Sequence, residues 1–395
     1  MPKKVLFISH NAGRTGAPLM LLNVLKWWEQ NTDIPFEILL RETGPLKEEF
    51  CKLAPTNLYQ GPGTIPHVPS FFPKASKFIQ YLTRQHHKNL LKHLQSSEIG
   101  LIYSNTITNG DILETLSPLK CPTITHVHEL DYWIDMSGEK NLEQVKKHSR
   151  HYIAASEAVK KNLVEEYSLP GENIDVVHSF IPTDGIMANP AGIRQQLGIP
   201  EEAFVILGSG YETWRKGKDL FVQLAARVNE KSPEINVHFL WVGGRIEGEE
   251  HRNILHDIQR LELTGRVHFI GEVNNPLDYF AAGDVFAMVS REDPFPLVSL
   301  EAALLEKPVL CFDKAGGMPE FVEDDAGFIT PYLDLAKMAE KIVDLSSNSA
   351  VKNRLGKTAA KKVREFYDTQ NGSRRIEAIV KKELQPLVSG ERNSF

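Results

Sequence analysis

Short apolar runs rich in β-branched residues alternate with longer amphipathic segments along the chain, and this alternation constrains the fold more than any other feature. Near-continuous apolar runs of this length are typical of parallel strands that helices cover on both faces. The runs fall into two sets, which predicts an α/β protein made of two Rossmann-like domains. The first set is Val5–Ser9, Phe36–Leu40, Ile99–Ser104, Thr123–His128, Tyr152–Ala154 and Ile174–Val177, and the second is Phe204–Gly208, Val237–Val242, Val267–Ile270, Val285–Val289 and Pro308–Phe312.

A segment that Pro and Gly punctuate, Ser179–Gly185, separates the two sets and marks the expected boundary between domains. The 395 residues exceed what one ordinary core accommodates. We therefore expect an N-terminal Rossmann-like domain over residues 1–182 and a C-terminal Rossmann-like domain over 183–365, with residues 366–395 forming a helix and polar tail that packs back on the first domain. Two such domains facing each other would form a cleft, and ligands of open parallel sheets bind at the carboxyl ends of the strands.

Composition excludes several classes of protein. No run of about 18 apolar residues occurs, so no transmembrane helix is expected. The three cysteines form no C-x-x-C pair that would indicate a zinc site or disulfide framework. The net charge is −6. Residues 1–182 are balanced, with 19 Lys+Arg and 19 Asp+Glu, so the excess of acidic residues lies in the second half. An acidic half of this kind argues against a general nucleic-acid binder. Because the first residues lack the long apolar stretch of a signal peptide, we expect a cytoplasmic protein.

The first candidate site follows the expected strand Val285–Val289. A turn rich in carboxylates leads there into a helix that begins near Pro296, and the free N–H groups at such a helix start suit a diphosphate. Glu301 lies eight residues after Asp293, and its carboxylate could accept hydrogen bonds from a vicinal diol such as that of ribose. On spacing alone, a residue on the helix surface is the competing interpretation of Glu301.

The second candidate site is the turn that follows the expected strand Phe204–Gly208. Arg215 and Lys216 are adjacent in it, just before an expected helix. Two cations beside a helix start concentrate positive potential where a pyrophosphate can bind, with Arg offering a planar fork and Lys a point charge. An exposed basic turn is the alternative.

Two strand ends in the first half also hold candidate residues. The turn Gly13–Pro18 opens a helix, and its glycines would let the backbone approach a phosphate, although neither GxGxxG nor a Walker motif occurs. His126 and His128 lie on one face of the expected strand Thr123–His128. They could bind a metal, but no third ligand is evident beyond the nearby Glu129 and Asp131, and a hydrogen-bonding role is the alternative.

These motifs together resemble those of a known family. Asp293 and Glu301, separated by seven residues, resemble the E-x7-E motif of the retaining GT-B glycosyltransferases of family 4 (glycosyl transferases group 1), with Asp in place of the usual first Glu. The family's diphosphate-binding Arg and Lys-Gly resemble Arg215 and Lys216, although the family's Arg usually stands several residues earlier, near Tyr211. The turn Ala315–Glu320 resembles its Gly-Gly-x-Pro-Glu turn.

The resemblance implies that the domain over residues 1–182 binds the acceptor and that the domain over residues 183–365 binds the nucleotide-sugar donor. It also implies a role for each matching residue. Asp293 would contact the donor sugar, Glu301 the ribose, and Arg215 and Lys216 the diphosphate. The residues that the resemblance places elsewhere around the donor are Gly16 near its phosphates, Val273 at its nucleobase, His128 beside the reacting sugar, and the backbone of Phe295, Pro296, Leu297 and Val298 along the sugar and phosphates. Of all these residues, His128, Arg215, Lys216 and Asp293 are the expected catalytic ones.

The resemblance also implies the reaction. A sugar would move from a UDP- or GDP-linked donor to a hydroxyl acceptor with retention of configuration, and the acceptor would be a cell-surface polysaccharide or a lipid-linked glycan precursor. No metal and no other cofactor is expected, because cationic side chains and helix starts would stabilise the departing diphosphate. The alternatives are a GT-B-fold sugar-nucleotide epimerase and a non-catalytic module that binds nucleotide sugars.

A basic segment, residues 71–94, suggests a second kind of partner. An amphipathic basic helix with aromatic residues can lie on an anionic membrane, which would make the protein peripheral on the inner membrane. A helix that packs on the core with a solvated basic face is the equal alternative. The segment contains no acid between Phe71 and Leu94, and its basic and aromatic residues are Phe71, Phe72, Lys74, Lys77, Phe78, Tyr81, Arg84, Lys88 and Lys92.

Overall fold

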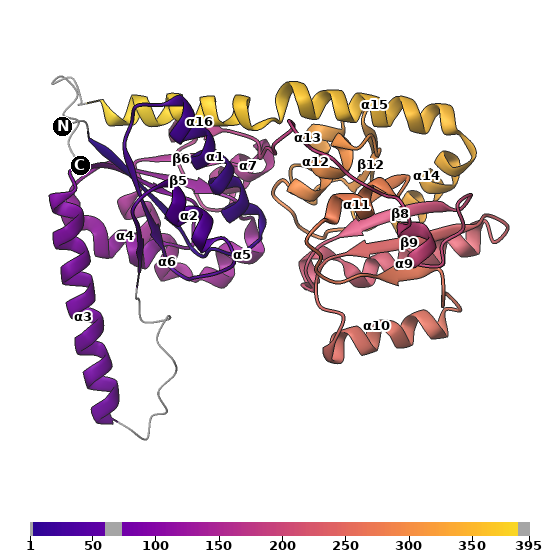
Figure 1. The fold of residues 1–395 in the computed structure, drawn as a ribbon, viewed down its shortest axis with the longest axis horizontal. Helices are drawn as coiled ribbons and strands as arrows, with labels where there is room; N and C mark the ends of the chain where they lie inside the picture. Colours follow the sequence, from indigo (N-terminus) through magenta and orange to yellow (C-terminus); the bar gives the residue numbers. More distant parts are fainter. Residues whose placement is uncertain (1–2, 60–72, 386–395) are drawn as a thin grey trace. The chain divides into compact units, whose positions relative to one another are not determined.

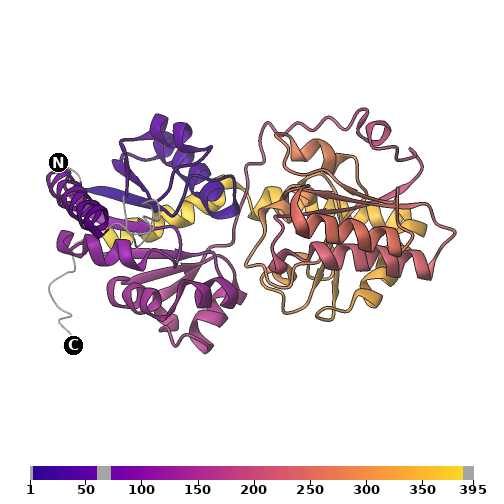
Figure 2. The same ribbon diagram turned by 90° about the horizontal axis from the view of Figure 1, so that it is seen from below.

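A computed structural model describes residues 3–59 and 73–385, without the side chains of residues 73–83. The chain divides into two compact units, which are described separately. Unit one comprises Met1–His178 with Thr369–Phe395, and unit two comprises Ser179–Asp368. The expected boundaries after residues 182 and 365 lie within a few residues of these two crossings. Figures 1 and 2 show that helices cover both faces of the sheet in each unit.

Unit one is built on a parallel sheet of seven strands in the order β3-β2-β1-β4-β5-β6-β7. The register pairs Val5 with Phe36 on one side of β1 and with Leu101 on the other. The chain therefore reverses its direction of travel across the sheet between β1 and β4, which is where open parallel sheets bind ligands. The strands are β1 (Lys4–Ser9), β2 (Phe36–Leu40), β3 (Thr56–Leu58), β4 (Ile99–Ser104), β5 (Thr123–Val127), β6 (His151–Ala154) and β7 (Ile174–Val176).

Helices of unit one bury apolar faces against this sheet. Trp28 packs edge-on against Phe7 of β1, with ring centroids 5.4 Å apart. The last helix also belongs to unit one, since Trp27 donates to Gln370 over 2.5 Å. The helical segments are α1 (Gly16–Asn31), α2 (Lys47–Leu53), α3 (Pro73–Ser96), α4 (Gly110–Leu116), η1 (Ser117–Leu119), α5 (Asp131–Ser137), α6 (Glu139–His148), α7 (Glu157–Glu165), η2 (Gly171–Asn173) and α16 (Thr369–Leu384).

Unit two repeats this topology with a parallel sheet of six strands in the order β10-β9-β8-β11-β12-β13. Its reversal point lies between β8 and β11. The strands are β8 (Phe204–Ser209), β9 (Val237–Val242), β10 (Val267–Phe269), β11 (Val285–Met288), β12 (Val309–Phe312) and β13 (Gly327–Thr330). The helical segments are α8 (Ile193–Gln196), η3 (Trp214–Lys216), α9 (Lys218–Lys231), α10 (Gly248–Arg260), α11 (Pro276–Ala281), α12 (Leu297–Leu304), α13 (Met318–Val322), α14 (Leu335–Ser347) and α15 (Ser349–Phe366).

The predicted α/β class with two Rossmann-like domains is confirmed, and every predicted strand overlaps an observed one. The sequence missed two strands, β3 and β13. Both are at sheet edges, where a strand is paired on one side only and needs no continuous apolar run. All three residues of β3 are half-buried, and Ile329 of β13 is exposed. Apolar patterning therefore finds the central strands and fails at these edges.

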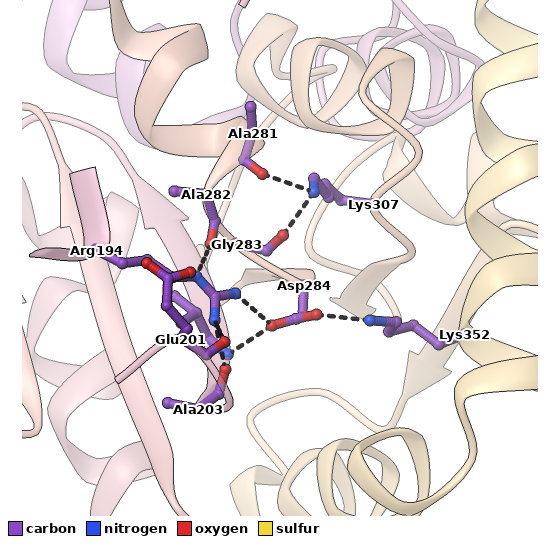
Figure 3. Close-up of polar contacts among 10 residues, drawn as sticks. Arg194, Glu201, Ala203, Ala281, Ala282, Gly283, Asp284, Lys307 and Lys352 are labelled. Carbon is purple, nitrogen blue, oxygen red and sulfur yellow. Dashed lines mark hydrogen bonds and ion pairs between the residues drawn. The ribbon is translucent and has the colours of Figure 1, made fainter. Parts of the chain in front are cut away.

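A network of charges fixes the amino end of β11 in unit two (Figure 3). Asp284 accepts from Lys352 over 2.6 Å, from Arg194 over 3.2 Å and from the backbone N–H of Val205 over 2.9 Å. Figure 3 shows Arg194 and Lys352 reaching Asp284 from opposite sides. The other donors saturate backbone carbonyls: Arg194 reaches those of Glu201, Ala203 and Ala282, and Lys307 reaches those of Ala281 and Gly283.

The two ends of unit two are joined to each other. The N–H of Ile181 donates to the carbonyl of Tyr367 over 3.0 Å, and Ile181 and Asp368 form an isolated parallel bridge. Unit two therefore begins and ends at one place.

Within the described residues, we find no helix both long and apolar enough to cross a membrane.

Candidate active site

Two loops at the reversal point of unit two are locked together. Residues 210–217 follow β8 and residues 289–296 follow β11, and the N–H of Arg291 donates to the carbonyl of Arg215 over 2.7 Å. Gly217 has φ +73°, and a Cβ there would lie 2.2 Å from the carbonyl oxygen of Val289. Only glycine satisfies both conditions, so the two loops approach more closely than any side chain would permit.

Asp293 holds both candidate cations at this edge of the sheet. Its carboxylate lies 2.6 Å from Lys216 Nζ and 3.4 Å from the Arg215 guanidinium, and it accepts from Ser290 Oγ over 3.2 Å. Burial raises the pKa of the Asp293 carboxyl, but the attraction of Lys216 and Arg215 outweighs burial and brings that pKa below its ordinary value. The arrangement is therefore ionic and carries one net positive charge.

The Gly-Gly turn supports Asp293 from the other side. The N–H of Asp293 donates to the carbonyl of Ala315 over 2.6 Å, and the N–H of Gly317 donates to the carbonyl of Pro294 over 2.9 Å. Gly316 adopts φ +132°, which favours glycine. This turn therefore supports the Asp293 loop through two backbone hydrogen bonds.

Helix α12 begins beside Asp293 with no side chain capping its amino end. Pro296 is the N-cap residue, as predicted, and Leu297 begins the helix. The N–H of Ser299 donates to the carbonyl of Pro296 over 3.2 Å, while the N–H groups of Leu297 and Val298 precede the regular hydrogen bonds of the helix. The helix points partial positive charge at the edge where Lys216 and Arg215 lie, so this edge of the sheet suits an anionic ligand.

Glu301 lies on α12 and, unlike Asp293, has no cationic partner among the described residues. Its carboxylate makes no hydrogen bond or ion pair with any described residue. Burial raises the pKa of Glu301 to about 7. An acceptor that is partly desolvated and unpaired is costly unless a ligand supplies donors to it.

The remaining predicted donor residues fall into two groups. Pro296 and Leu297 are buried and Val298 is half-buried at the start of α12, while Val273 is half-buried in the loop after β10. The Phe295 ring instead stacks on Tyr367 with centroids 5.5 Å apart, so its side chain packs the interior of unit two. For Phe295, only the backbone can serve the site, which is the role that the sequence assigned to it.

Lys218, next to this edge of the sheet, is a buried cation that the sequence did not indicate. Lys218 is 2% exposed; its Nζ donates to the carbonyl of Arg245 over 3.2 Å and lies 4.6 Å from the centre of the Phe269 ring. Burial is the main cause that lowers the pKa of Lys218, and Glu212 opposes it. Lys218 thus ties the loop after β9 to the start of α9. A lysine in a polar turn gives no sequence signal of burial.

In unit one, Gly16 begins α1 after β1, and His128 follows β5, which is the next strand beyond β4 in the sheet. Gly16 is the first residue of α1 and is exposed, with open space where a Cβ would lie. His128 follows β5, and its ring lies 4.0 Å from that of His126, which confirms that the two share a face. His128 Nε2 lies 3.1 Å from Asn105 Oδ1. Burial, with a smaller contribution from His10, lowers the pKa of His128 to about 3, so its ring is neutral.

The candidate metal ligands do not converge. Glu129 accepts from Thr106 Oγ1 over 2.5 Å and from the N–H of His128 over 2.9 Å, so it caps the loop after β4. Asp131 instead accepts from Asn162 Nδ2 over 2.6 Å. Among the described residues, no three His, Cys, Asp or Glu side chains are grouped to hold a metal ion.

The basic segment forms α3, as its sequence predicts, but only part of it can be described. Arg84, Lys88 and Lys92 are exposed and four residues apart on one face, while Leu90 and Leu94 are buried in the core. This half of the helix matches the packed alternative. Phe71 and Phe72 lie outside the described residues, as do the side chains of Lys74, Lys77, Phe78 and Tyr81. Binding of α3 to an anionic membrane stays a prediction.

Comparison with known proteins gives two family matches and many relatives. The model for glycosyl transferases group 1 matches residues 191–362, and that for glycosyltransferase family 4 matches residues 38–184. The N-acetyl-alpha-D-glucosaminyl L-malate synthase of Bacillus anthracis is 25% identical over 221 residues, which are 55% of this chain and 56% of that protein. A D-inositol 3-phosphate glycosyltransferase of Streptomyces avermitilis is 30% identical over 208 residues, 51% of this chain and 43% of that protein. The match therefore spans about half the length of these curated relatives.

Solved structures share the fold over nearly the full chain. Anabaena Alr3699/HepE, in complex with UDP and glucose, superposes with a TM-score of 0.79 at 21% identity and covers 96% of this chain and 99% of its own. WaaG, a glycosyltransferase involved in lipopolysaccharide biosynthesis, superposes with a TM-score of 0.67 at 16% identity, covering 94% and 99%. The expected GT-B fold class is confirmed by these neighbours.

Proposed function

We propose that the chain, which matches the models for glycosyl transferases group 1 and glycosyltransferase family 4, moves a sugar from a nucleoside-diphosphate sugar to a hydroxyl acceptor with retention of configuration. One observation supports this most directly. At the reversal point of unit two, Lys216 and Arg215 meet beside the uncapped start of α12, and Glu301 lies on the same helix without a partner among the described residues. A diphosphate satisfies the cations and the helix start, and a ribose diol satisfies the carboxylate.

Each residue has a proposed part in the reaction. Lys216, Arg215 and the α12 amino end stabilise the charge that develops on the diphosphate as the anomeric C–O bond breaks. Asp293 keeps the two cations in place and is the proposed contact of the donor sugar, and Glu301 accepts hydrogen bonds from the ribose. Gly16, His128, Val273 and the backbone at residues 295–298 keep the roles that the resemblance implies for them.

The finer chemistry is proposed from the same residues. The acceptor oxygen bonds to the anomeric carbon on the face that the phosphate leaves, and the acceptor proton passes to the departing phosphate oxygen. No metal is required, because protein cations neutralise the phosphates. UDP is the first nucleotide to test, since a fold neighbour is described as a complex with UDP and glucose. A relative from Rhizobium meliloti is described as a lipopolysaccharide core biosynthesis glycosyltransferase, and we propose a cytoplasmic enzyme with a polysaccharide or lipid-linked glycan acceptor.

A calorimetric titration of the full chain tests the donor proposal. UDP-, GDP- and ADP-linked sugars are titrated with EDTA present, using wild type, Lys216→Ala and Lys352→Ala. Both lysines lie 2.6 Å from a carboxylate in unit two, which makes Lys352 a matched control. We expect one donor to bind, Lys216→Ala to weaken it roughly 10- to 100-fold as for a hydrogen bond to a charged group, and Lys352→Ala to leave it unchanged.

Three results would contradict the proposal. If no nucleotide sugar binds, the proposed donor class is wrong. If both lysine variants bind it as wild type does, the donor site is elsewhere. If binding requires a divalent ion removed by EDTA, metal independence is wrong. Product analysis without acceptor then separates transfer from epimerisation, because an epimerase converts the donor sugar alone.

A further inference from the structure

Asn105 connects three strand ends in unit one. It is fully buried just after β4, and its backbone N–H donates to the carbonyl of Ile8 on β1 over 2.9 Å. Its side-chain Nδ2 donates to the carbonyl of Ala17, in the first turn of α1, over 2.8 Å. Its Oδ1 lies 3.1 Å from His128 Nε2, beyond β5. One amide therefore links the glycine turn to the histidine.

These contacts determine where the His128 proton lies. The carbonyl of Ala17 can only accept, so the Asn105 side chain must present its NH2 to Ala17 and its oxygen to His128. That oxygen can also only accept, so Nε2 of His128 must hold the hydrogen. The ring is neutral, as its lowered pKa shows, and Nδ1 is therefore left with a free lone pair. Nδ1 makes no hydrogen bond with any described residue.

We propose that Asn105 is a positioning residue that fixes His128 as the Nε2–H tautomer, so that Nδ1 accepts a hydrogen bond from a hydroxyl group of the sugar substrate. This rests on the proposed function, since it names the kind of group that meets His128. A sugar hydroxyl donates readily to a neutral imidazole nitrogen, whereas in the opposite tautomer Nδ1–H would donate to the hydroxyl oxygen. Asn105 thus selects for a hydroxyl donor without touching the sugar.

The groups around His128 allow this state to persist. His10 lies at the end of β1, with Arg41 near it, and burial and Arg41 lower the pKa of His10 to about 4. His126 is buried, and its Nδ1 lies 2.6 Å from the hydroxyl of Tyr103 on β4. Glu129 binds the backbone N–H of His128 and not its ring. Of these groups, none gives the ring a counter-ion that would favour protonation.

Nitrogen NMR of histidine-labelled full chain tests the tautomer directly. Wild type should show His128 with its proton on Nε2 throughout pH 6–8. Asn105→Leu removes the acceptor, and the His128 signals should shift toward those of the other tautomer. Asn109→Leu is the matched control, because Asn109 is equally buried in the same loop but donates to Ser104 and not to His128. A wild-type proton on Nδ1, or equal shifts in both variants, would overturn the assignment.

The pH dependence of transfer tests the consequence for substrate. Asn105→Asp keeps an acceptor against Nε2 but adds a negative charge, which raises the pKa of His128. Relative to wild type at the same pH, its kcat/KM should fall about 10-fold between pH 8 and pH 6, as Nδ1 becomes protonated and can no longer accept. The ratio to wild type is the measure, because wild type, Asn109→Leu and Asn105→Asp share any effect of Glu301.

A second comparison separates this proposal from the proposed function. Affinity for UDP alone, which lacks the sugar, should be the same in wild type and Asn105→Leu, while affinity or turnover for the sugar nucleotide falls about 10-fold in the variant. If the NMR result holds but both ligands behave alike, the hydroxyl contact is wrong. If no nucleotide sugar binds wild type, the proposed function fails while the tautomer result stands.

Discussion

Each end of β11 holds a cluster of one aspartate, one lysine and one arginine, but the two clusters differ in how far the surrounding hydrogen-bonding groups are satisfied. At the amino end, Asp284 lies 2.6 Å from Lys352 and 3.2 Å from Arg194. Beyond the carboxyl end, Asp293 lies 2.6 Å from Lys216 and 3.4 Å from Arg215. Distances and charges alone do not tell the two clusters apart.

Hydrogen-bonding capacity does tell them apart. At the amino end, Val205 also donates to Asp284, and the spare donors of Arg194 and Lys307 reach backbone carbonyls, as Figure 3 shows. At the carboxyl end, α12 begins without a cap and Glu301 has no partner among the described residues. We infer that the first cluster holds the strands together and that the second awaits a ligand. In unit two, the ion pairs therefore indicate a ligand site only at the end of β11 where neighbouring hydrogen-bonding groups lack partners.

The largest expected effect is on turnover. Asp293→Asn removes the charge that holds Lys216 and Arg215, so both cations shift from the place where charge develops in the transition state. Turnover should fall roughly 10²- to 10³-fold, the order seen when one preorganised electrostatic contact is lost. Steady-state kinetics with the donor identified by calorimetry would measure it, and a loss below about threefold would argue that the cluster is structural.

The reverse pattern is expected at the other end of β11. Asp284→Asn leaves Lys352 and Arg194 without a counter-ion, and the free energy of unfolding should fall by roughly 2–4 kcal/mol, because breaking a partly buried pair is costly. Turnover measured well below the melting temperature should change less than about threefold. Urea titration gives the stability. If Asp284→Asn lowers turnover as much as Asp293→Asn does, the inferred difference between a structural cluster and a ligand-binding cluster is wrong.

Glu301→Gln should separate binding from stability. Donor affinity should weaken by roughly 1.5–3 kcal/mol, as for a hydrogen bond to a charged group. Stability at pH 8 should rise instead, because burial raises the folded pKa of Glu301 from 4.5 to about 7. Between these values the unfolded carboxyl is ionised and the folded one protonated, so stability falls as pH rises and is lowest above pH 7. Gln removes that cost, which is on the order of 1–3 kcal/mol. A Gln variant no more stable than wild type at pH 8 would mean that Glu301 is well solvated.

The smallest expected effect is on pH dependence. If ionised Glu301 accepts from the ribose, wild-type affinity for the sugar nucleotide should fall about 10-fold between pH 8 and pH 6, as a carboxyl with a pKa near 7 takes up its proton. The sugar nucleotide is the right probe, since its phosphates do not titrate in this range. Glu301→Gln should bind equally at both values. A pH slope that persists in the variant belongs to another group.

The sequence predicted the central architecture and indicated Arg215 and Lys216 as candidates for binding an anion, because both inferences depend on local patterns. Apolar runs predict strands that are buried on both faces, and the adjacent residues Arg215 and Lys216 predict a cationic turn. It could not show that Lys216 meets Asp293, since 77 positions separate them and only sheet topology brings their loops together. The same holds for Asn105 and His128, which share no motif.

Burial was the other property beyond the reach of sequence. Lys218 stands in a polar turn and would ordinarily be solvated, yet it lies under Phe269. Phe295 sits within the motif but packs on Tyr367. In both cases, tertiary packing overrides what residue type suggests, because the neighbours that decide exposure come from distant segments.

The bridge between Ile181 and the residues at 367–368 has a consequence for how such enzymes diversify. A segment whose entry and exit are hydrogen-bonded to each other can be exchanged as a cassette, because the host chain need only supply two adjacent ends. Residues 179–368 are such a cassette. Recombination at these two points would transplant the whole of unit two, with its sheet intact, into a chain that keeps its own unit one. If unit two binds the donor and unit one the acceptor, as we propose, new pairings of donor and acceptor are then reachable by exchange of units as well as by gradual substitution.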